Sequence, residues 1–113
     1  MSDNKTRMFL PYKVTTTSKK EIEFKFHLDI NTESPLFINE TVNIILSKIS
    51  SEIDIANPSN GDIIQAMCMA LVIRCKIIDY DLEKIENIVN DTLKKAFSDA
   101  KKAEVSIPLS GNT

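Results

Sequence analysis

Residues 62–78 read DIIQAMCMALVIRCKII, and this stretch decides how the rest of the chain can fold. At the ~100° per residue of an α-helix, the polar side chains Asp62, Gln65 and Lys76 fall within about 60° of one another. Nearly every other direction is apolar, which is typical of a buried helix. The longest apolar run, residues 66–73, is far shorter than the roughly 18 residues of a membrane span. The stretch therefore predicts the buried core helix of a globular domain, with no membrane contact.

Apolar residues of this helix also lie where a monomer needs a polar surface. Met69 and Val72 lean into the polar stripe, and Arg74 projects among apolar neighbours on the other side. A guanidinium keeps its charge, so Arg74 must reach water or meet a carboxylate. We interpret it as reaching past the core edge or pairing with an acid, with an anion-binding or inter-subunit role as the alternative. Because methionine packs adaptably, Met67 joins Met69, Val72 and Arg74 as a predicted oligomer contact.

Two strands are predicted before the helix. Residues 21–30 alternate strictly, which places five apolar side chains on one face of a strand. Residues 8–17 alternate over a shorter run, and Pro11 confines that strand to a sheet edge or a strand start. Residues 18–20 form the turn of the resulting N-terminal antiparallel hairpin.

Two further helices flank the central one. Ser34 followed by Pro35 predicts the start of a helix over residues 35–55, because serine caps helices and proline suits the first helical position. Ser59 is placed to cap the central helix. Asp79 or Asp81 is placed to cap a third helix, whose apolar stripe runs from residue 82 to residue 100.

The predicted fold class is therefore α+β, a two-stranded antiparallel hairpin packed on three α-helices with the middle one buried. Residues 8–103 are expected to form a single globular domain, because 113 residues suit one domain. Residues 1–7 and 104–113 are expected to be flexible tails.

Charge and cysteine content restrict the possible partners and the cellular compartment. A formal net charge of −2 disfavours nucleic acid and anionic membranes as partners. Cys68 and Cys75 would lie about 10.5 Å apart along one helix, beyond the roughly 7 Å that a disulfide spans. They are predicted to be reduced and buried, and the expected location is cytoplasmic.

No catalytic constellation is evident. His27 is the one imidazole, and on a strand it would share a face with Lys25 and Asp29. That is the pattern of a solvated strand surface. Asp79 and Asp81 are spaced like the start of a calcium loop, but the turn glycine and the closing acid are missing. We expect no catalytic residue, metal, cofactor or small-molecule ligand, and a non-enzymatic protein.

Two functions are compatible with these features. The first is an interaction or structural module that acts as a homo-oligomer, most simply a homodimer, because the apolar surface around residues 66–73 exceeds what one copy can cover. The alternative rests on the order strand, helix, helix, which is similar to that of ribbon-helix-helix DNA-binding regulators. In that reading Lys25 and His27 would contact DNA. The acids Glu21, Glu23 and Asp29 would repel its phosphates.

Overall fold

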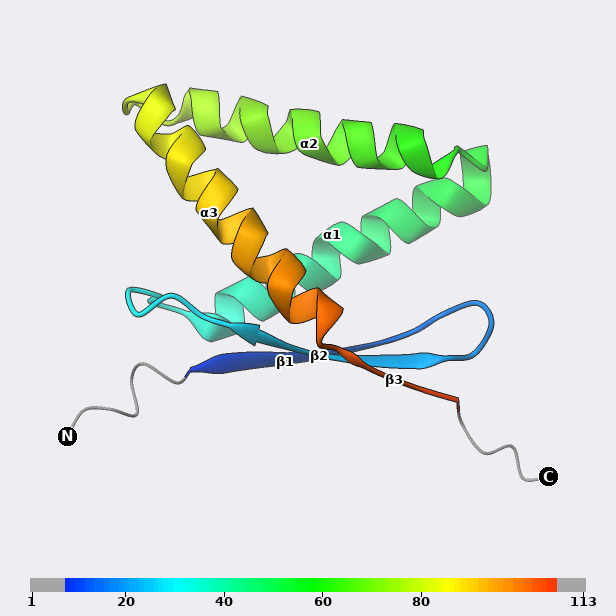
Figure 1. Ribbon diagram of the computed structural model, residues 1–113. Helices are drawn as coiled ribbons and strands as arrows, with labels where there is room; N and C mark the ends of the chain where they lie inside the picture. Colours follow the sequence, from blue (N-terminus) through cyan, green and yellow to red (C-terminus); the bar gives the residue numbers. More distant parts are fainter. Residues whose placement is uncertain (1–7, 108–113) are drawn as a thin grey trace. The chain divides into compact units, whose positions relative to one another are not determined.

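The computed structural model describes residues 8–107 of the chain. In chain order the elements are β1 (Phe9–Thr15), β2 (Glu21–His27), α1 (Pro35–Ala56), α2 (Asn60–Ile77), α3 (Leu82–Lys101) and β3 (Glu104–Ser106). The predicted α+β class is confirmed, with a hairpin followed by three helices (Figure 1). No helix in this part of the chain has both the length and the hydropathy needed to cross a membrane.

The chain divides into two compact units. The sheet unit holds residues 8–39 and 92–107 of the described chain, and the helical unit holds residues 40–91. Because the boundaries fall within α1 and α3, each of these helices has residues in both units. The expectation that residues 8–103 act as a single domain stays a prediction.

The sheet unit is built on the antiparallel β1–β2 hairpin, in which Leu10 lies opposite Phe26. Its turn contains no glycine. Lys19 takes the left-handed conformation, with φ at 69°, and its N–H donates to the carbonyl of Thr16 at 2.9 Å. The predicted alternation is confirmed over residues 21–27, where the apolar face is half-buried and most of the charged side chains on the other face are exposed. β2 ends at His27, so Leu28 and Ile30 of the predicted apolar face lie outside the strand.

A third strand corrects the prediction of a two-stranded sheet. β3 pairs antiparallel with β2, with Val105 opposite Ile22, so β2 is the middle strand of three. Residues 104–106 are therefore not part of a flexible tail. Three residues are too few to show a period-two pattern, so this strand exists only through its pairing with β2. The predicted tails at residues 1–7 and 108–113 lie outside the described residues.

Local capping starts each helix where the sequence predicts. Ser34 Oγ accepts from the N–H of Phe37 at 3.1 Å, and Ser59 Oγ accepts from the N–H of Asp62 at 3.1 Å. Asp81, rather than Asp79, caps α3 by accepting from the N–H of Glu83 at 3.0 Å. These side chains satisfy N–H groups that a first helical turn leaves without partners.

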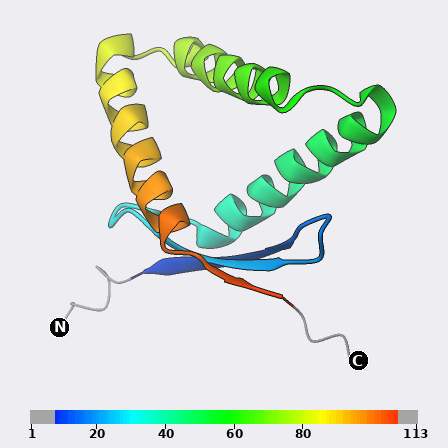
Figure 2. The ribbon, with the colours of Figure 1, turned by 45° about the vertical axis from the view of Figure 1, so that its right-hand side comes forward.

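The prediction that the middle helix is buried is wrong for the single chain. No residue of α2 is buried, and among residues 8–107 the one buried apolar side chain is Ile85. Within the helical unit, α1 and α2 diverge from the loop of residues 57–59 and do not lie side by side (Figure 2). The following α2 side chains are more than half exposed: Ile64, Met69, Val72, Ile73 and Ile77.

Candidate functional site

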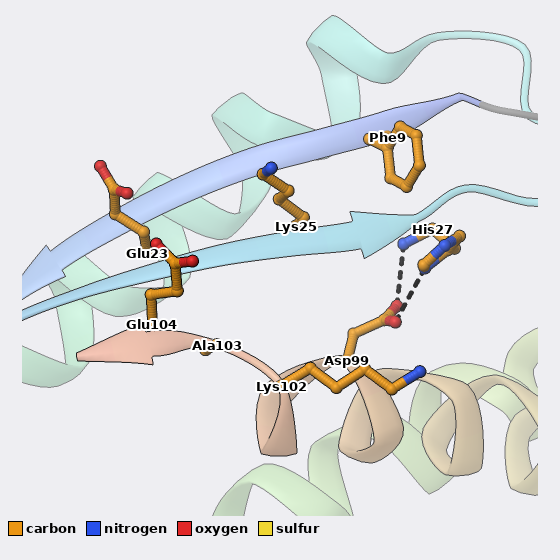
Figure 3. Close-up of a pocket in the computed structure, with 8 residues that line it drawn as sticks. All are labelled: Phe9, Glu23, Lys25, His27, Asp99, Lys102, Ala103 and Glu104. Atoms are coloured by element: carbon orange, nitrogen blue, oxygen red, sulfur yellow. Dashed lines mark hydrogen bonds and ion pairs between the residues drawn. The ribbon is translucent and has the colours of Figure 1, made fainter.

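A part-buried polar contact of the sheet unit joins the end of β2 to the last turns of α3. Asp99 is the one buried charged residue within residues 8–107, at 7% exposure. Its Oδ2 accepts a hydrogen bond from the backbone N–H of His27 at 2.8 Å, and its Oδ1 lies 2.8 Å from Nδ1 of the same histidine (Figure 3). One carboxylate thus holds both the backbone and the ring of His27.

The limits of β3 explain this contact. β3 pairs with only the first residues of β2. Glu104, the first residue of β3, lies opposite Glu23, and the chain before it is helical up to Lys101. Beyond Glu23, the edge of β2 that faces β3 has no strand beside it, and the N–H of His27 needs another acceptor. Asp99 supplies that acceptor from α3 and so continues the hydrogen bonding of the sheet edge.

The carboxylate of Asp99 is ionised at neutral pH. Burial by itself would raise its pKa, but the hydrogen bonds from the backbone and side chain of His27 outweigh burial and lower the pKa below its ordinary value. The positive charge of Lys102 acts in the same direction. An ionised Oδ1 can only accept, so Nδ1 of His27 carries the hydrogen of this contact.

A hollow of about 220 Å³ lies beside this pair (Figure 3). Its lining residues are Phe9, Glu23, Lys25, His27, Asp99, Lys102, Ala103 and Glu104. The ring of Phe9 is 4.7 Å from the ring of His27, between centroids. A histidine held by a carboxylate is the usual setting of a general base, but the lining contains no serine, cysteine or threonine for it to activate. Within residues 8–107 no group of three or more potential ligands could hold a metal ion.

Asp99 is the site residue that sequence reasoning missed. The histidine was considered with Asp29, but β2 ends at His27 and the hydrogen-bonded acid comes from 72 residues further along the chain. One signal was available: on a helix Asp99 falls in line with Thr92 and Ile85, at intervals of seven residues. An acid on that partly apolar side of α3 indicates a buried carboxylate in need of a donor.

Lys25 and His27, the predicted DNA contacts, do lie on one exposed face of the sheet. Lys25 and His27 share this face with acidic side chains. Glu104 is opposite Glu23, and Lys13 lies 3.7 Å from the carboxylate of Glu23. This mixture of charges has no net positive character, which phosphate binding requires.

The predicted oligomer contacts lie on α2 and are accessible in the single chain. Met69 and Val72 are each 58% exposed and Met67 is 43% exposed. Arg74 is exposed as well, and among residues 8–107 no ion pair involves it. Arg74 is therefore not enclosed in the single chain, and its predicted role stays a prediction.

The helical unit also contains an apolar groove of about 330 Å³, where the end of α1 meets the start of α2. Its floor combines Ile49 and Ile53 of α1 with Ile63 and Met67 of α2. Lys48 and Glu52, which are 3.6 Å apart, are charged residues of its lining. A concave apolar surface of this kind suits an apolar side chain or a helix.

Comparison of the chain with models of protein families, with curated proteins and with solved structures gives no match.

Proposed function

We propose that the protein is a non-enzymatic interaction or structural module that self-associates as a homodimer through its helical unit. One observation carries the proposal: α2 is apolar on almost every side, and none of it is buried. Helices that stay in contact with water have one apolar stripe and one polar face. Continuous exposed apolar surface on a small protein marks an interaction site.

The energetic gain from covering α2 is substantial. Fully burying a Val, Leu, Ile or Met side chain stabilises by about 1.5–3 kcal/mol, so a half-exposed residue such as Met69 or Val72 gains about 1 kcal/mol when covered. A second copy supplies the same apolar surface in return, and twofold association is the commonest arrangement of soluble oligomers. Both cysteines are free, which fits the reducing, cytoplasmic setting that we include in the proposal.

The DNA-binding alternative receives no comparable support. A ribbon-helix-helix dimer pairs one strand of each copy across its twofold axis. Here β2, which precedes the helices, already pairs with β1 on one side and β3 on the other. His27, a predicted base contact, has its Nδ1 bound to Asp99.

Light scattering after gel filtration tests the proposal. At micromolar concentration we expect a mass of twice the 12.7 kDa of one chain. Val72→Glu, which would bury a charge at the interface, should shift the protein to the monomer mass with its helix content retained. Asn87→Glu, which adds the same charge to an exposed polar position of α3, serves as the control. A wild-type monomer would remove the basis of the proposal.

A further inference from the structure

One edge of the sheet is closed by a proline. In the β1–β2 hairpin the N–H of Leu28 donates to the carbonyl of Met8 at 3.0 Å, so the even-numbered residues of both strands face the partner strand with their backbone groups. Pro11, an odd-numbered residue opposite Lys25, therefore faces the outer edge of β1. A proline there removes an N–H that another strand would need, which is a common way of blocking pairing at a sheet edge.

The β3 side of β2 has a stretch with no strand beside it. β3 lies beside residues 21–23 of β2 and is itself three residues long. The N–H of His27 faces this side, because its acceptor is Asp99 and not β1. Lys25 is two residues earlier, so its N–H and C=O face the same side, and the β2–β3 register of the described chain has no residue opposite it. We call this side of residues 25–27 the open edge.

The open edge belongs to a strand that suits pairing with another copy. Phe24 and Phe26 stack on the apolar face with their ring centroids 5.2 Å apart, and aromatic residues favour strands. An unpaired strand edge is a template for any second strand, and a second copy of the chain brings an identical one. In an antiparallel pair of two copies, Lys25 of one and His27 of the other would exchange both of their backbone hydrogen bonds.

Asp99 occupies the place that such a second strand needs. Its Oδ2 takes the N–H of His27 and its Oδ1 holds the ring, both at 2.8 Å, and the residue is 7% exposed (Figure 3). An ionised carboxylate only accepts hydrogen bonds, so it repels the carbonyl oxygens that an incoming strand must bring to the same edge. Lys102, which follows α3, lines the same hollow as Lys25.

We propose that Asp99 is a guard of the open edge, which keeps β2 from pairing with β2 of a second copy. This pairing is distinct from the proposed homodimer, which uses the helical unit. The guard comes from α3 and depends on the contact with His27. Loss of the Asp99 carboxylate therefore turns a protein of defined mass into one that associates through its sheets.

Asp99→Ala tests the guard. At micromolar concentration, light scattering should show particles several times heavier than the wild type, and the infrared spectrum should gain the band of intermolecular antiparallel sheet. Asp99→Asn should keep the wild-type mass, because its amide oxygen still accepts from the N–H of His27. Ile85→Ala is the stability control, since it removes a buried apolar side chain of the helical unit and leaves the open edge guarded. Each variant is compared at the same interval below its own thermal midpoint.

A proline at position 25 separates edge pairing from other association. Added to Asp99→Ala, Lys25→Pro removes an N–H of the open edge and no hydrogen bond to β1, so it should restore the wild-type mass. Lys25→Ala in the same background removes the charge but keeps the N–H, and should stay associated. In the wild type, amide hydrogen exchange followed by NMR should be slow at His27 and fast at Lys25.

Each outcome supports or overturns the guard. Association of Asp99→Ala that Lys25→Pro reverses and Lys25→Ala does not supports it. A wild-type mass for Asp99→Ala, or association that Lys25→Pro leaves unchanged, overturns it. Equal association of Ile85→Ala also overturns it, because association then follows loss of stability. If Asp99→Ala does not fold, the exchange in the wild type decides: a fast Lys25 amide supports an open edge, and protection equal to that of His27 overturns it. All masses are compared with the wild type, so failure of the guard leaves the proposed homodimer standing.

Discussion

Replacing Asp99 by alanine removes the one buried carboxylate among residues 8–107 and both of its hydrogen bonds to His27. The backbone N–H of His27 is then left without an acceptor beside the sheet, which costs about 1–3 kcal/mol. The second hydrogen bond, from the ring to a charged acceptor, is worth a similar amount before solvent competes for it, because the His27 side chain is 54% exposed. We expect Asp99→Ala to lower the free energy of unfolding by about 2–3 kcal/mol.

Asp99→Asn should cost less, about 1 kcal/mol. The amide oxygen of asparagine still accepts from the N–H of His27. Its NH₂ group can donate to Nδ1 when the ring moves its hydrogen to Nε2, so both hydrogen bonds persist without the negative charge. The order wild type, asparagine, alanine is therefore the expected order of stability. It distinguishes a hydrogen-bonded clamp from a contact that merely fills space.

The measurement is urea unfolding followed by circular dichroism, at one fixed protein concentration because association changes apparent stability. Exchange of the His27 amide hydrogen, followed by NMR, should accelerate in Asp99→Ala. Asp54→Ala removes an exposed carboxylate of α1 and should change stability by less than about 0.5 kcal/mol. If Asp99→Ala is as stable as Asp54→Ala, the clamp does not hold α3 to the sheet.

The same pair gives a defined pH dependence. The folded-state pKa of Asp99 lies below its ordinary value of 3.8, so the stabilisation is present above that pH and is lost as the pH falls through the lowered value. The stability difference between wild type and Asp99→Asn should therefore shrink as the pH falls from about 5 towards 3 and below. A difference that grows over this acid range would contradict the ionised state of Asp99.

A further prediction concerns partners. A low-salt mobility-shift assay with random duplex DNA should show no retardation, because the exposed face of the sheet mixes acids with Lys25 and His27; clear retardation would revive the DNA-binding alternative.

Local patterns account for most of the secondary structure. The alternation in β2 and the capping residues Ser34, Ser59 and Asp81 act within a few residues of their own positions. A hydrogen bond from a helix N–H to a serine three residues earlier needs no distant partner, so the sequence alone predicts it. The predicted elements therefore match the observed ones to within a few residues at their ends.

The candidate site was less accessible to this reasoning. His27 and Asp99 are 72 residues apart, and β3 is three residues long, so neither pairing leaves a periodic signal. Only the folded sheet unit shows that β3 does not extend along β2 beyond Glu23. The N–H of His27 therefore takes its acceptor from Asp99 of α3.

The sequence by itself determined that residues 62–78 form a helix too apolar to remain in water, because the spacing of side chains around a helix is fixed by the backbone. The tertiary structure decided that this helix, α2, is not buried by the rest of its own helical unit, because α1 and α2 diverge from the loop of residues 57–59. Composition sets how much apolar surface must be buried. The paths of the connecting loops set whether neighbouring helices of the same unit can reach it.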